Sequence, residues 1–114
     1  MNILVFDTIG KAAISRDSGL KIKTLIDKQL SDTGSVVIDF SNVELYASPF
    51  FNAAIATYLG TMTVEQMREQ FSFLNLNNVG RNLLNQVIHN AIQFYSKSEE
   101  EQEKIQSGIE NGVE

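Results

Sequence analysis

The chain alternates short apolar runs with longer stretches in which apolar residues recur at helical spacing. The short runs lie at residues 2–6, 35–40 and 71–76 and are rich in β-branched and aromatic residues, which predicts three strands. The run at 35–40 is typical of a central parallel strand, and the run at 2–6 is predicted to be buried on both faces. Strands that alternate with helices indicate an α/β fold with a small, mostly parallel or mixed sheet flanked by helices.

The first predicted helix follows Ser15, a residue type that suits the cap position before a helix. The Ser-Asp-Thr-Gly sequence at residues 31–34 ends it. Between these limits the apolar residues have the three-and-four spacing of an amphipathic helix, at Ile22, Leu25, Ile26 and Leu30.

A second helix is predicted from the stretch LYASPFFNAAIATYLG at residues 45–60. Ser48 is placed as its amino-terminal cap and Pro49 as its first residue, because proline has a helical φ and no N–H to satisfy. The helix is expected to run to about Leu59, where a glycine follows. The polar residues at 61–70 predict a turn or an irregular helix.

Two roles for Ser48 follow from that position, and the sequence leaves both open. As a cap, its oxygen would accept a hydrogen bond from a backbone N–H of the first turn, which contributes about 1 kcal/mol. As a phosphoacceptor, it would place a phosphate at the positive end of the helix, beside an apolar surface containing Phe50 and Phe51. Such a charge would be enough to reverse the binding of a partner.

The last predicted helix begins after a cap at Asn77 or Asn78 and reaches about Tyr95. Its apolar residues cover more than half of the circumference, which is wider than a core-facing stripe requires. The excess predicts contact with another element or another chain, and a homodimer through this helix would cover it. His89 lies opposite the arc and is expected to be exposed. The arc comprises Val79, Leu83, Leu84, Val87, Ile88, Ala91, Ile92, Phe94 and Tyr95.

Composition excludes several classes of function. The 114 residues include no cysteine and one histidine, so neither disulfides nor thiolate-bound metals are expected, and no cofactor is predicted. The amino-terminal apolar run is too short for a signal peptide or a membrane span, which predicts a cytoplasmic protein without a membrane partner. The sequence has no phosphate loop, dinucleotide-binding glycine pattern or catalytic constellation, and an enzyme is not expected.

The negative charge is concentrated at the carboxyl end. The formal net charge is −5, and the residues from Lys97 onward contain six glutamates and two lysines. The preceding body is nearly neutral and lacks a Lys/Arg stripe of the kind that binds a phosphate backbone, so no nucleic-acid partner is expected. Residues 1–96 are predicted to form one domain, and residues 97–114 an acidic tail that is disordered or a frayed helix.

Three stretches resemble the STAS-like domain family, which is related to the STAS domains of bacterial anti-sigma-factor antagonists. They are ISRDSGLKIKTLI at residues 14–26, VVIDFSNVELYASPFFNAAIATYLG at 36–60 and FLNLNNVGRNLLNQVI at 73–88. The resemblance covers residues 1 to about 95, and its most specific piece is the strand, aspartate, short loop and helix of the second stretch. It implies a small, non-enzymatic signalling regulator.

In the antagonists, the corresponding helix begins at an Asp-Ser-Ser-Gly-Leu motif whose second serine is phosphorylated by a kinase with a GHKL-type ATPase fold. The resemblance places Ala47 on the motif aspartate, Ser48 on the first serine and Pro49 on the phosphorylated serine. Phe50 and Phe51 take the glycine and leucine positions. Pro49 has no hydroxyl to phosphorylate, which leaves Ser48 as a displaced substitute. STAS-like members often occur beside GHKL-type ATPase domains, so such an ATPase is an expected partner even without phosphorylation.

The favoured hypothesis is a bacterial regulatory domain that docks onto a GHKL-type ATPase or a similar signalling protein through the start of the Ser48 helix. The alternative is a domain that senses a nucleotide or other small molecule at the strand ends near Asp39 and Ser48. Asp39 is also expected to accept hydrogen bonds from the turn that follows it. The residues expected to contact a partner are Arg16, Asp39, Tyr46, Ala47, Ser48, Pro49 and Phe50.

Overall fold

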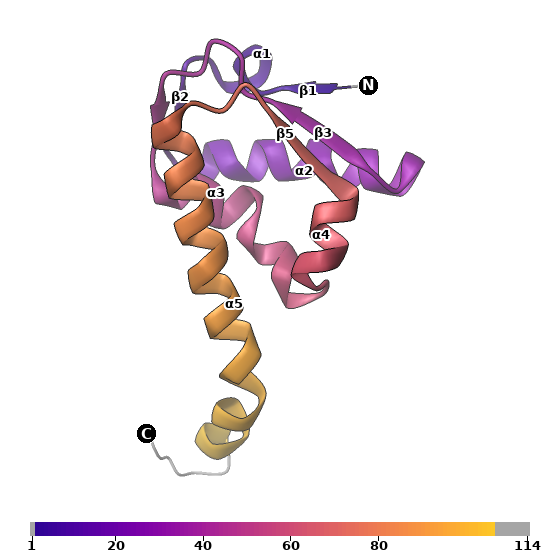
Figure 1. The fold of residues 1–114 in the computed structure, drawn as a ribbon, viewed down its shortest axis with the longest axis vertical. Helices are drawn as coiled ribbons and strands as arrows, with labels where there is room; N and C mark the ends of the chain where they lie inside the picture. Colours follow the sequence, from indigo (N-terminus) through magenta and orange to yellow (C-terminus); the bar gives the residue numbers. More distant parts are fainter. Residues whose placement is uncertain (1, 107–114) are drawn as a thin grey trace.

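The structure is a computed structural model that describes residues 2–106, with side chains described as far as Tyr95. Helices and short strands alternate along the chain, as the hydrophobic pattern predicts (Figure 1). In chain order the elements are β1 (Asn2–Leu4), α1 (Val5–Ile9), β2 (Ala12–Ala13), α2 (Arg16–Thr33), β3 (Val36–Asp39), β4 (Leu45–Tyr46), α3 (Ser48–Ala54), the 3₁₀ helix η1 (Ala56–Gly60), α4 (Val64–Gln70), β5 (Phe71–Leu74) and α5 (Asn78–Gln106).

The three longer strands of the described chain form a parallel sheet in the order β1-β3-β5. This arrangement confirms the predicted α/β fold and the central position of the strand at 35–40. The register aligns Ile3, Ile38 and Phe73 across the sheet. Their side chains lie in or against the hydrophobic core, so this face of the sheet is covered by the helices. β2 and β4 form a separate two-stranded parallel pair that the sequence did not predict.

Within the described residues, the opposite face of the sheet is open to solvent. The register aligns Leu4, Asp39 and Leu74 on this face, and Leu4 and Leu74 are 43% and 40% exposed. The prediction that the first strand is buried on both faces is therefore wrong. β1 is an edge strand that ends at Leu4, the chain enters α1 at Val5, and in β1 only Ile3 is buried.

α2 has the boundaries that its sequence predicts. The Ser15 side chain accepts a hydrogen bond from the backbone N–H of Ser18 at 3.1 Å and caps the helix. At the other end, Gly34 takes a left-handed conformation with φ of 79° and ends it. Between them Ile22 and Ile26 are completely buried, which places one side of α2 in the core.

α2 and α3 approach each other closely at Gly19. A Cβ atom at this position would lie 2.5 Å from the carbonyl oxygen of Phe50 and 2.8 Å from the Cβ of Ala53. No side chain fits there, so the glycine permits the two helix backbones to come into contact. As a result the first turn of α3 is held against α2.

The aromatic residues at the start of α3 form the centre of the core. Phe50 and Phe51 are completely buried, and their rings meet edge to face with centroids 5.3 Å apart. Tyr46 stacks on Phe51 at 6.0 Å, and Phe40 contacts both phenylalanines. The prediction that Phe50 and Phe51 contribute to an exposed apolar surface is therefore wrong.

The helix predicted from Pro49 to about Leu59 is divided into two elements. α3 ends at Ala54, and the chain continues as the 3₁₀ helix η1 to Gly60. Four consecutive residues are buried across this junction, and because consecutive residues of an α-helix lie 100° apart, one face of a regular helix cannot hold all four: Ala53, Ala54, Ile55 and Ala56. The polar segment that follows forms a regular helix, α4, because Thr63 and Gln66 make a reciprocal capping box.

α5 begins as predicted and continues further. The Asn77 side chain accepts a hydrogen bond from the backbone N–H of Gly80 at 2.8 Å, which caps the helix. The helix extends past the expected end at Tyr95 to Gln106, beyond the proposed domain boundary, and in Figure 1 it runs past the rest of the molecule. The remainder of the predicted tail, residues 107–114, lies outside the described residues.

The apolar arc of α5 is partly used inside the molecule. Leu84, Val87 and Ala91 are buried in the core, whereas Val79 and Phe94 are 60% and 57% exposed. The arc is therefore wider than the core requires, as its sequence pattern predicts. Within residues 2–106 no helix is long and apolar enough to cross a membrane.

The contact at Gly19 generates a prediction. Gly19→Ala should destabilise the protein by about 1–3 kcal/mol, because the new methyl group overpacks the crossing of α2 and α3. An exposed glycine in a helix would behave oppositely and gain up to about 1 kcal/mol on the same change. The free energy of unfolding is measured in urea, with Ser31→Ala on the exposed side of α2 as the control. A stabilised Gly19→Ala variant would contradict the observed crossing.

Candidate functional site

The candidate site is built around the start of α3. The chain is held extended up to Ala47, because β4 pairs with β2 and the backbone N–H of Ala47 donates to the carbonyl of Ala13 at 3.0 Å. The helix therefore begins at Ser48, with Ala47 as the cap residue and without a side-chain capping bond. The prediction that Ser48 caps this helix is wrong, and its hydroxyl is not used in that way.

The residues expected to contact a partner around the start of α3 differ in exposure. Phe50 is completely buried and is excluded from any contact surface in this structure. Tyr46 is half-buried, and its hydroxyl donates to the carbonyl of Val43 at 3.2 Å. Burial raises the pKa of Tyr46 above its ordinary value. Ala47 and Ser48 are half-buried, whereas Pro49 is exposed.

Asp39 lies at the carboxyl end of β3 and is occupied by hydrogen bonds from its own chain. Its Oδ1 accepts from the backbone N–H of Ser41 at 2.9 Å, from the Ser41 hydroxyl at 2.7 Å and from Nδ2 of Asn75 at 2.9 Å. The expected bonds from the following turn are confirmed, and Asn75 is a partner that the sequence did not reveal. These bonds, the one from Asn75 foremost, lower the pKa of Asp39. Asp39 thus ties the ends of β3 and β5 together, and no hydrogen bond among the described residues joins it to Ser48.

A groove of about 370 Å³ lies between α2 and α3, and we call it the α2–α3 groove. It brings together Arg16 and Pro49, two of the residues expected to contact a partner, from distant parts of the sequence. Leu20, 38% exposed, adds apolar surface, and none of the lining residues is acidic. The full lining is Arg16, Leu20, Lys23, Pro49, Asn52, Ala53 and Thr57.

A second groove, of about 280 Å³, lies between α5 and the α3–η1 segment. Asn52 and Thr57 line both grooves, so the two lie side by side on one surface. Phe94 of α5, 57% exposed, is the most exposed aromatic side chain of this surface. We call the two grooves together the α3 face. Its second groove is lined by Asn52, Ala56, Thr57, Asn90, Ala91, Phe94 and Tyr95.

Only part of the α3 face was predictable from the sequence. The surplus apolar width of α5 correctly indicated that a residue such as Phe94 remains uncovered. Asn52 and Thr57 were missed, although each is an isolated polar residue within an apolar stretch, which marks the solvent side of a buried helix. Leu20 was missed because its exposure depends on how α2 meets α3.

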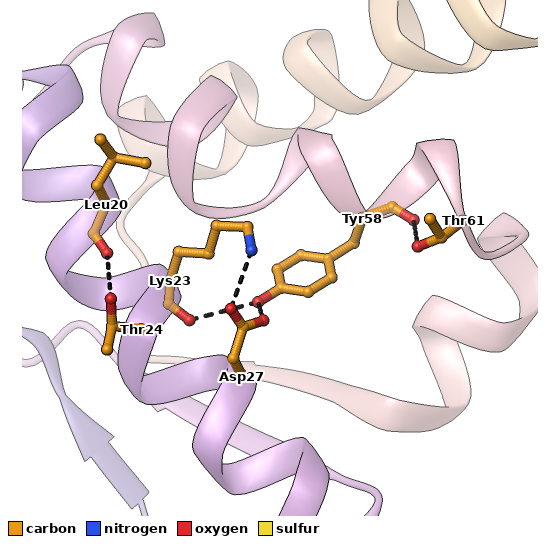
Figure 2. Close-up of polar contacts among 6 residues, drawn as sticks. All are labelled: Leu20, Lys23, Thr24, Asp27, Tyr58 and Thr61. Atoms are coloured by element: carbon orange, nitrogen blue, oxygen red, sulfur yellow. Dashed lines mark hydrogen bonds and ion pairs between the residues drawn. The ribbon is translucent and has the colours of Figure 1, made fainter.

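A polar clamp fixes one side of the α2–α3 groove (Figure 2). The Tyr58 hydroxyl donates to the carboxylate of Asp27, and Nζ of Lys23 lies 3.0 Å from the other oxygen of that carboxylate. Lys23 Nζ also lies 4.9 Å from the centroid of the Tyr58 ring. The clamp therefore holds η1 against α2 and orients Lys23 beside the groove.

The clamp alters the proton affinities of both acids. Burial alone would raise the pKa of Asp27, but the hydrogen bonds from Tyr58 and Lys23 outweigh it, and the pKa falls below its ordinary value of 3.8. Burial and the neighbouring carboxylate of Asp27 raise the pKa of Tyr58. The clamp is therefore formed by an ionised Asp27 and a neutral Tyr58 near neutral pH.

No cluster of three His, Asp or Glu side chains within the described residues is placed to hold a metal ion. His89 is exposed, as expected, and its Nε2 lies 3.1 Å from the side-chain nitrogen of Gln93.

The clamp predicts a pH-dependent loss of stability. Tyr58→Phe should cost about 1 kcal/mol near pH 7, a value reduced by solvent because the Asp27 side chain is 51% exposed. The pKa of Asp27 is lower in the folded protein than in the unfolded chain. The clamp therefore contributes its full stability above the pKa that Asp27 has in the unfolded chain, and this stability is lost as the pH falls through the pKa of Asp27 in the folded protein. The cost should therefore shrink below about pH 4 in urea unfolding experiments.

Tyr46→Phe is the matched control for this experiment, because the Tyr46 hydroxyl donates to a backbone carbonyl that does not titrate. Its cost should be the same at neutral and acidic pH. Equal pH dependence of the two tyrosine variants would show that the Tyr58 bond to Asp27 is unimportant.

The start of α3 predicts a contrast between two serines. Ser15→Ala should cost about 1 kcal/mol, since Ser15 caps α2 through its side chain. Ser48→Ala should change the free energy of unfolding by less than about 0.5 kcal/mol, since Ser48 makes no capping bond. Thermal or urea unfolding of the two variants tests this. Similar losses at both positions would mean that Ser48 caps its helix after all.

Comparison with known proteins places the fold in a family. Residues 18–81, more than half of the chain, match the sequence model of a protein family described as "STAS-like domain of unknown function (DUF4325)". The match runs from α2 to the start of α5 and includes most of the α2–α3 groove. No match was found among curated proteins or among solved structures. With this match and an α/β fold of the expected kind, the chain belongs to the STAS-like domain family of unknown function.

Proposed function

We propose that the protein is a non-enzymatic regulatory domain that binds a signalling protein, in the first place a GHKL-type ATPase, through its α3 face. The observation that carries this proposal is the pair of adjoining grooves on either side of Asn52 and Thr57. The family relationship supports a regulatory role, and the resemblance to anti-sigma-factor antagonists suggests the class of partner.

The chemistry of the α3 face suits a protein partner. Protein interfaces combine a few aromatic, aliphatic or arginine anchors with a polar surround. Here Phe94 and Leu20 are exposed apolar anchors, Arg16 is an exposed cation, and Asn52 lies between the grooves. The groove volumes of 280 and 370 Å³ lie just below and near the lower limit of the roughly 300–1,000 Å³ typical of small-molecule pockets. A side chain from a partner fits each groove better than a whole ligand does.

The proposed surface differs from the one expected from the sequence. Phe50 points into the core, so the contact moves to the outer side of α3, where Pro49 and Asn52 are exposed. Binding through this side does not require a phosphate on the chain. Ser48 is the residue before Pro49, and its phosphorylation stays a prediction that mass measurement after incubation with an ATPase and ATP can decide.

The alternative, a ligand site shared by Asp39 and Ser48, receives less support. Asp39 Oδ1 already accepts three hydrogen bonds from its own chain, and in the described structure those bonds link it to Ser41 and Asn75. Protein binding is therefore the function that the described geometry favours.

The proposal is tested by photo-crosslinking in cells of the native host. A photoreactive phenylalanine derivative replaces Asn52, which is exposed between the two grooves, and in a control chain it replaces Ser72, which is exposed on the open sheet face. The position-52 chain should give a covalent adduct whose mass spectrum identifies a GHKL-type ATPase or another signalling protein, and the position-72 chain should not.

A second measurement uses the identified partner in purified form. Asn52→Lys places a long charged side chain between the grooves and should weaken binding at least about tenfold, whereas Ser72→Lys should leave it unchanged. Equal adducts at positions 52 and 72, or unchanged affinity of Asn52→Lys, would overturn the proposed surface.

A further inference from the structure

A third groove runs along the free edge of the sheet. β1 pairs with β3 and, within the described residues, has no neighbour on its other side. A space of about 400 Å³ lies beside it, bounded by β1, α1 and α2. Its lining residues are Asn2, Ile3, Leu4, Asp7, Thr8, Leu25, Lys28, Gln29 and Asp32. The unpaired backbone of an edge strand is a template for another strand.

The surroundings of this edge are apolar at the centre and carry charges of both signs. Leu4 and Leu25 line the groove and are 43% and 37% exposed. At the rim, Lys28 on α2 shares the groove with the carboxylates of Asp7 and Asp32. Large apolar side chains are thus exposed next to backbone groups that lack a partner strand.

We propose that the free edge of β1 binds a second copy of this chain. In this dimer the two β1 strands lie antiparallel across a two-fold axis and join the two parallel sheets into one continuous sheet. Leu4 and Leu25 of each copy are covered by the other copy. Lys28 of each copy faces the carboxylates at Asp7 and Asp32 of the other.

The distribution of charge selects a second copy over other occupants. A two-fold interface is formed by the same patch on both copies, so each contact occurs twice and the patch has to complement itself. A rim that carries one lysine, Lys28, together with two aspartates, Asp7 and Asp32, has charges of both signs and meets this condition, whereas a rim of one sign would require a partner of the opposite sign. β1 is only three residues long, so the leucines must supply much of the binding.

This interface is separate from the α3 face. Leu25 lines the β1 groove and Leu20 lines the α2–α3 groove, although both lie on α2 with nearly equal exposure of 37% and 38%. The dimer does not depend on the proposed function, and each leucine can be changed without touching the other surface.

Sedimentation velocity over about 1 µM to 1 mM protein tests the dimer. The unmodified chain should dimerise with increasing concentration, and Leu25→Asp should raise the dimer dissociation constant at least about tenfold. Leu20→Asp is the matched control on the same helix and should sediment as the unmodified chain does. An unmodified chain that stays monomeric throughout this concentration range would overturn the proposal. So would a dimer that is dissociated by Phe94→Asp but not by Leu25→Asp, and this result would assign the dimer interface to α5.

A charge exchange keeps the test decisive if Leu25→Asp fails to fold. One variant carries Lys28→Glu, and a second variant carries both Asp7→Lys and Asp32→Lys. Each variant by itself should stay monomeric, because like charges meet across the two-fold axis. An equimolar mixture of the two chains should form a heterodimer, since every rim contact then joins opposite charges. Homodimers of either variant as stable as the unmodified dimer, or a mixture that does not associate, would contradict the proposed interface.

Discussion

The close crossing of α2 and α3 at Gly19 is the constraint on which the rest of the structure depends. Because Gly19 has no side chain, the Phe50 carbonyl approaches α2 and the first turn of α3 is held there. Phe50 and Phe51 are then directed into the core, where Phe40 contacts both rings and Tyr46 stacks on Phe51. The same crossing leaves Asn52 and Pro49 on the outer side of α3. The buried centre of the core and the exposed α3 face are therefore two consequences of one helix contact.

Local signals in the sequence predicted the helices and strands better than they predicted the tertiary contacts around them. The caps Ser15 and Asn77 and the stop at Gly34 were recognisable because each acts within one turn of its helix. The exposure of Phe50 was predicted wrongly, because its burial depends on contacts with other elements, namely Phe40 after β3 and α2 at Gly19. The pair β2–β4 was missed since each strand has two residues, too few for any periodicity. What the sequence could not give was the set of tertiary neighbours.

In the candidate site, too, local features were predicted and contacts between elements were not. Arg16 and Pro49 were both named from the sequence, and the fold brings them into one groove. The bonds of Asp39 to its own turn were also predicted, because an Asx-type turn is a local structure. Asn75 and Leu20 were not found, since the role of each is set by a contact with a different element. Sequence reasoning located the helix that forms the site but not the side of it that is available.

α2 connects the two proposed surfaces. Its buried side, with Ile22 and Ile26, faces the core, while Leu20 and Leu25 emerge toward the α3 face and the β1 groove respectively. A dimer through β1 would leave both α3 faces open and relate them by the two-fold axis. A partner that is itself a two-fold dimer can then engage both faces, and the second contact forms at the high effective concentration set by the first. If a partner engaged both α3 faces at once, its apparent affinity would exceed that of a single face.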